Sequence, residues 1–138
     1  MRTDYRDAHY RHWLDAELLT ENNRLANADH LYGVAAECGL KRLMQEFGMP
    51  FDPDKDKPQK RKDREHIDRI WDRYETYRSG HLHGASYGLP IRNPFGDWHV
   101  AQRYANRSEF NRERVARHRN GAEFVWRLIR QAERVGLI

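Results

Sequence analysis

Two pairs of arginine and histidine are the residues in this sequence whose types and spacing could do chemistry. The first pair is Arg112 and His118, with five residues between them, and the second is Arg78 and His83, with four. Histidine exchanges a proton near neutral pH, and arginine stays charged and binds a phosphate through two parallel hydrogen bonds. RNA cleavage through the 2′-hydroxyl needs a general base, a general acid and a cation for the phosphorane. Both pairs are therefore candidate catalytic sites.

The first pair lies in a segment whose hydrophobic spacing favours a helix. Six residues of a straight helix turn through about 240°, so Arg112 and His118 would point apart. Either the helix begins after Arg112, or Arg114, one turn before His118 on the same face, supplies the charge. The alternative interpretation makes His118 a helix-interface histidine with a satisfied hydrogen bond and Arg112 a solvated side chain. For the second pair the alternative is a structured loop in which Arg78 caps the carbonyl groups of the preceding helix.

The net charge of +4 is distributed unevenly along the chain. Residues 1–48 hold six Lys or Arg against eight Asp or Glu, residues 49–101 hold ten against nine, and residues 102–138 hold nine Arg against four Glu. A basic C-terminal helix suggests an anionic partner, with nucleic acid as the first candidate. Its expected contacts are Arg103, Arg107, Arg117 and Arg119. The alternative is an Arg-rich face that is solvated or that pairs with the acidic first segment.

Four helical segments are predicted to position these residues. Apolar side chains at helical spacing predict a helix over residues 4–21. They predict a second helix that begins after its expected N-cap, Asn27, and ends at Gly48. Small residues along the second helix, among them Gly33 and Gly39, would let another helix approach closely. A third helix is expected over residues 64–77, and a long basic one from about Ser108 almost to the end of the chain. The prediction is an all-α bundle of four to five helices.

The rest of the chain is predicted to be loop within one domain, residues 1–138. Residues 49–62, with three prolines and five Lys or Arg, and residues 79–96, with four glycines and two prolines, are expected to be insertions. The single cysteine, Cys38, is expected to be structural, and no run of residues is apolar enough to cross a bilayer. These features indicate a cytoplasmic protein without membrane contact. No metal or cofactor is predicted, because the sequence has no zinc-type Cys/His cluster and no glycine-rich phosphate loop.

Two expectations concern side chains near the candidate site. Most aromatic residues lie at helical spacing and are predicted to be core, but Trp98 lies outside a clear helix, near Arg103 and Tyr104. An exposed aromatic ring beside arginine could stack on a nucleic-acid base. His30 and its neighbour Asp29 are expected to form an exposed polar pair.

The run DAELLTENNRLANADHLYGVAAECGLKRLMQEFGM resembles the opening hairpin of HEPN-type domains. His66-Ile67 and Arg103-Tyr104 also resemble that family, and the matching hairpin residues are Ala16, Leu18, Leu19, Ala28, Ala35, Ala36, Glu37, Leu40 and Lys41. The resemblance implies a helical bundle that commonly dimerises. Many members are metal-independent ribonucleases of toxin and defence systems that use an Arg and a His four to six residues apart. Others are non-catalytic binding modules or partners of nucleotidyltransferases.

Three hypotheses follow, because fold alone does not choose between these activities. The first is a non-catalytic HEPN-like module of a toxin or defence system that binds a protein or a nucleic acid. The second is a metal-independent ribonuclease that works as a homodimer with His118 and an arginine. Glu113 counts against this hypothesis, since it stands where the family often has a small polar residue and would repel a phosphate. The third is a nucleotide-binding subunit beside a separate nucleotidyltransferase.

Overall fold

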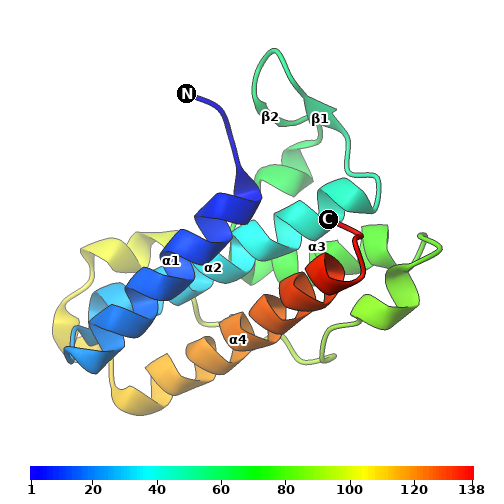
Figure 1. Ribbon diagram of the computed structural model, residues 1–138. Helices are drawn as coiled ribbons and strands as arrows, with labels where there is room; N and C mark the ends of the chain where they lie inside the picture. The colour runs from blue at the N-terminus through cyan, green and yellow to red at the C-terminus, as the bar shows by residue number, and fades with distance from the viewer.

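The computed structural model describes residues 1–138 and confirms the predicted all-α class. Four helices form the body: α1 (Tyr5–Glu21), α2 (Leu25–Glu46), α3 (Ile67–Arg78) and α4 (Arg112–Arg134) (Figure 1). A two-stranded antiparallel sheet of β1 (Phe51–Asp52) and β2 (Lys57–Pro58) follows α2. Four 3-10 helices complete the chain: η1 (Arg61–Arg64), η2 (Gly84–Tyr87), η3 (Val100–Tyr104) and η4 (Arg107–Glu109).

Helices α1 and α2 form the predicted antiparallel hairpin. Asp4 caps α1 by accepting a hydrogen bond from the backbone N–H of Asp7 at 3.0 Å. The turn contains Asn23 at a φ of 58°, a left-handed conformation that asparagine tolerates better than most residues. The prediction of Asn27 as the N-cap of α2 is wrong, because this turn lets the helix begin at Leu25, and Arg24 occupies the cap position without a side-chain cap hydrogen bond.

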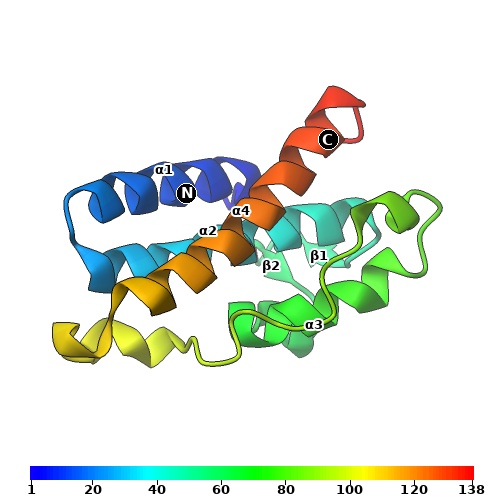
Figure 2. The same cartoon turned by 90° about the horizontal axis from the view of Figure 1, so that it is seen from below.

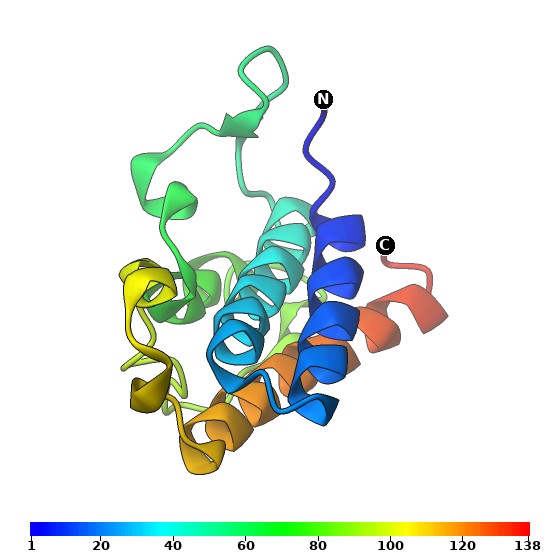
Figure 3. The ribbon, with the colours of Figure 1, turned by 90° about the vertical axis from the view of Figure 1, so that its left-hand side faces the viewer.

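Helix α2 is the centre of the fold, with α1 and α4 on one side and α3 on the other (Figures 2 and 3). Its small residues have two different partners. At Gly39 a Cβ would lie 2.5 Å from Val125 Cγ1 of α4, so this glycine does admit a helix, as predicted. At Gly33 a Cβ would lie 2.2 Å from Trp98 Nε1, so this glycine admits an indole ring instead. The expectation that Trp98 is exposed is wrong, since only 1% of its surface is accessible.

The segment 49–62, predicted to be a loop, contains β1, β2 and the start of η1. The N-terminus is attached to it, because Thr3 donates hydrogen bonds from its backbone N–H and its hydroxyl to Asp56 Oδ2, both at 2.8 Å. The third helix starts later than predicted, at Ile67, since residues 61–64 form η1. Asp63 of η1 is fully buried and accepts hydrogen bonds from Arg73 and Tyr77 of α3 at 2.7 and 2.6 Å.

Helix α4 also begins later than predicted, at Arg112. Asn111 is its N-cap and accepts a hydrogen bond from the Arg114 backbone N–H at 2.8 Å, whereas Ser108 lies in η4. The buried face of α4 carries the apolar seam seen in the sequence together with His118. None of the helices combines the length and apolar character that a membrane span needs.

Candidate functional site

His118 lies at the centre of a cluster of ionisable side chains that begins in the core and ends at the surface. It is called here the His118 cluster and consists of His118, Asp29, Asp97 and Arg114. The imidazole is 0% exposed, with Nδ1 2.6 Å from Asp29 Oδ1 and Nε2 2.9 Å from Asp97 Oδ1. Phe95 stacks on its ring with the centroids 5.3 Å apart. Arg114 donates hydrogen bonds to Asp29 Oδ2 at 3.3 Å and to Asp97 Oδ2 at 3.1 Å. One face of α4 therefore supplies His118 and Arg114. Helix α2 supplies Asp29, and the loop before η3 supplies Asp97.

The cluster leaves no ring nitrogen of His118 free for chemistry. A hydrogen bond from Arg117, and then others from His118 and Arg114, hold the pKa of Asp97 well below its usual range, although burial opposes this. Asp29 accepts further hydrogen bonds from Gln102 and Arg114. Both ring nitrogens of His118 therefore lie within hydrogen-bond distance of a carboxylate oxygen. A general base must reach the proton that it removes from the substrate, and neither nitrogen of His118 faces an open site in this arrangement.

The structure brings only part of the predicted catalytic set together. Arg114, not Arg112, shares the face of His118, as the helical spacing indicated. Arg112 is the first residue of α4 and donates a hydrogen bond to Asn23 Oδ1 at 2.9 Å, away from the cluster. Arg78 pairs with Glu75 and donates to the Gly84 carbonyl at 3.1 Å, which closes the loop after α3. His83 is exposed in that loop.

The four arginines predicted to contact nucleic acid divide into two groups. Arg117 pairs with Asp97 at 2.7 Å, and Arg119 pairs with Glu17 of α1 at 2.7 Å and lowers the pKa of that glutamate. Arg119 therefore follows the alternative interpretation, in which the basic helix pairs with the acidic first segment, whereas the partner of Arg117 lies outside that segment. Arg103 and Arg107 are exposed and form no ion pair within the chain, so their charges are free for a ligand.

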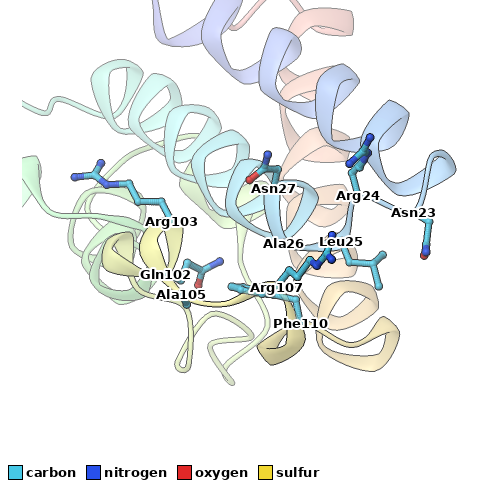
Figure 4. Close-up of a pocket in the computed structure, with 10 residues that line it drawn as sticks. All are labelled: Asn23, Arg24, Leu25, Ala26, Asn27, Gln102, Arg103, Ala105, Arg107 and Phe110. Carbon is cyan, nitrogen blue, oxygen red and sulfur yellow. The ribbon is translucent and has the colours of Figure 1, made fainter.

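Arg103 and Arg107 line a pocket of about 440 Å³, called here the arginine pocket (Figure 4). One wall is the turn before α2 and its first residues, and the other is the segment from η3 to the residue after η4. A third exposed arginine without an ion pair, Arg24, stands at the cap position of α2. The lining residues are Asn23, Arg24, Leu25, Ala26, Asn27, Gln102, Arg103, Ala105, Arg107 and Phe110, and none of them is acidic.

The chemistry of the arginine pocket suits an anion. Three arginines line the pocket, with the side chains of Arg24 and Arg103 extending outward in different directions (Figure 4). At the same wall, the first N–H groups of α2 have no side-chain cap and no acidic residue in the first turn. Beside the pocket, Tyr104 is 79% exposed, and the Arg103 guanidinium lies over its ring at 4.9 Å from the centroid. The pocket thus combines positive charge with an exposed flat ring.

Sequence reasoning missed the carboxylate partners of His118. Asp29 was predicted to be exposed with His30, but it is fully buried, and His30 instead stacks on Trp98 with the ring centroids 5.5 Å apart. The helical spacing of α2 does place Asp29 next to Ala28 and Tyr32 on the buried face, which is the signal that could have identified it. Arg24 was also missed as a pocket residue. No pattern in the sequence around it indicates that residues 102–110 lie beside it in the fold.

The residues that carry the resemblance to HEPN-type domains lie mainly in the α1–α2 hairpin. Ala16, Ala28, Ala35 and Ala36 are fully buried there, and Lys41 pairs with Glu37 at 2.7 Å. Close packing of two helices accounts for these small residues in any family. Comparisons of the chain with protein-family models, with curated proteins and with solved structures find no match.

Proposed function

We propose that this protein is a non-catalytic, HEPN-like helical module that binds single-stranded RNA at the arginine pocket. The observation that carries the proposal is the set of three exposed arginines, Arg24, Arg103 and Arg107, around one pocket without a carboxylate. Arg114 of the His118 cluster and the nearby Arg117 both have acidic partners, whereas the three arginines of the pocket have none. A phosphate group would supply the missing negative charge.

A single strand suits the site better than a duplex. Bases of a single strand are free to stack on aromatic rings, and Tyr104 offers such a ring next to the pocket. A concave pocket can also enclose one backbone phosphate, whereas the phosphates of a duplex lie along a broad convex surface. RNA is the form to test first, because the sequence resembles a family that acts on RNA.

The ribonuclease hypothesis finds less support. It needs a histidine that reaches the scissile phosphate, and His118 is fully buried with both ring nitrogens bonded to carboxylates. The other histidine of the sequence motifs, His83, lies in the loop after α3. Arg78, the last residue of α3, already bonds to Glu75 and to the Gly84 carbonyl. A binding role needs neither histidine.

Replacing Arg103 and Arg107 together with alanine is expected to weaken RNA binding about 100-fold, at about tenfold per lost charge-assisted hydrogen bond. The slope of log Kd against log salt should fall by about 1.4, since each contact to a single strand contributes about 0.7. Fluorescence anisotropy with a labelled oligonucleotide at several salt concentrations measures both quantities, and electrophoresis of the recovered RNA shows whether it is intact.

The matched control is Arg134→Ala, because Arg134 is exposed, unpaired and at the far end of α4. The proposal fails if wild type does not bind RNA, or if the control weakens binding as much as the double variant. If the wild-type protein cleaves RNA without added metal and His118→Ala does not, the ribonuclease hypothesis would replace the proposed binding function. Tight binding of a mononucleotide with no gain from a longer strand would favour the nucleotide-binding subunit.

A further inference from the structure

A second basic pocket lies at the junction of η1 and α3. It has a volume of about 400 Å³ and is lined by Arg61, Lys62, Glu65, Arg69 and Arg73. Arg73 is occupied by the buried Asp63 at 2.7 Å. Arg61, Lys62 and Arg69 are exposed and form no ion pair, although Glu65 lies beside them. This pocket, called here the η1 pocket, therefore shares the exposed and unpaired cations of the arginine pocket, although it also contains one carboxylate.

The two pockets lie on the same side of the molecule. Figure 3 shows η1 above η3 and η4 on one side of the bundle, with α1 and the end of α4 on the other. Three rings in contact lie between the elements of the two pockets. His30 stacks on Trp98 with the ring centroids 5.5 Å apart, and the centroid of the His66 ring lies 6.3 Å from that of Trp98. His66 is the N-cap residue of α3 and directly follows Glu65 of the η1 pocket.

The carboxylate among the side chains that connect the pockets is already paired. The charge of Arg103 reaches His30, whose pKa is lowered by burial and then by this arginine. His66 is half-exposed, and its hydrogen bond to Glu37 at 3.1 Å raises its pKa. Glu37 in turn pairs with Lys41, which leaves no free carboxylate among these connecting side chains.

We infer that the η1 pocket is a second phosphate site for the same RNA strand, so that the ligand is a polymer of several nucleotides and not a mononucleotide. The inference rests on the proposed function, since it takes the arginine pocket as the first site. A strand would place one backbone phosphate in each pocket and cross the surface formed by His30 and His66. Binding at two pockets gives the strand an affinity that neither pocket provides alone.

The test compares two labelled RNA oligonucleotides of about four and about sixteen nucleotides, lengths that bracket the site sizes of single-strand grooves. The variant is Arg61→Gln with Arg69→Gln, which removes two exposed charges without adding negative ones. For the longer RNA we expect its affinity to fall at least about tenfold and its salt slope by about 1.4. For the shorter RNA we expect the affinity to stay within about twofold, because it reaches only one pocket. The control variant is Arg134→Gln.

A chemical readout gives an independent answer. The longer RNA should protect Lys62 from an acetylating reagent, and the shorter one should not. If the longer RNA binds but Arg61→Gln with Arg69→Gln leaves its affinity unchanged and Lys62 unprotected, the second site is wrong and the proposed function stands. If neither RNA binds wild-type protein, the proposed function itself fails.

Discussion

Replacing Asp29 with alanine is expected to lower the free energy of unfolding by about 3–5 kcal/mol, the usual effect of breaking a buried ion pair. Asp29 is fully buried and accepts hydrogen bonds from His118, Arg114 and Gln102. Its removal leaves the buried imidazole of His118 with one carboxylate partner instead of two, and Arg114 loses a partner as well. Urea unfolding followed by circular dichroism measures the change.

A double-mutant cycle tests whether the effect belongs to the pair. We expect Asp29→Ala and His118→Ala to be non-additive by at least about 1.5 kcal/mol, because each removes the same interaction. Asp15→Ala is the control, since Asp15 lies on the exposed side of α1 and pairs with nothing. Its effect should stay within about 0.5 kcal/mol. Additive single effects would mean that the cluster does not act as a unit.

Replacing Gly33 with alanine is expected to destabilise the fold by about 1–3 kcal/mol, even though alanine favours a helix more than glycine does. The new Cβ would lie 2.2 Å from Nε1 and 2.3 Å from Cε2 of the Trp98 indole, so the ring must move. That movement breaks the hydrogen bond from Trp98 Nε1 to the Asp29 carbonyl at 3.2 Å. The hydrogen-exchange rate of the Trp98 indole N–H, measured in NMR spectra, should rise together with the loss of stability.

Gly96→Ala is the control for this prediction. Gly96 lies two residues before Trp98, and a Cβ there would meet only the Asn93 carbonyl at the ordinary distance of 3.8 Å. Stability should change by less than about 0.5 kcal/mol. If the hydrogen-exchange rate of the Trp98 indole N–H is unchanged in Gly33→Ala, the close packing of the ring on this glycine does not require the missing side chain.

The helices could be predicted because their signals are local. Apolar spacing placed α1, and the repeat along α2 placed the central helix within a few residues. The 3-10 helices and the hairpin of β1 and β2 could not be predicted, since segments of two to five residues hold no complete hydrophobic period. The start of α4 was missed for a related reason: Ser108 and Asn111 are both good caps, and only tertiary packing selects between them.

The candidate site was less predictable because its charges are neutralised by residues distant in sequence. Helical spacing indicated that Arg114 shares a face with His118, and this is confirmed. Whether an arginine is free depends on carboxylates that fold toward it, such as Glu17 for Arg119, 102 positions away. Arg103 and Arg119 therefore look alike in the sequence, although only Arg103 keeps an unpaired charge.

Gln102 links the interior of the protein to its surface. Its side chain donates a hydrogen bond to Asp29 Oδ2 at 2.7 Å, and the same residue lines the arginine pocket. The position of η3, and with it Arg103, is therefore tied to the buried carboxylate of Asp29. By thermodynamic linkage, a ligand that holds η3 in place should raise the melting temperature of the whole protein, and damage to the interior should reduce affinity at the surface. Selection for RNA binding would then also select for a stable interior, although no interior residue contacts the ligand.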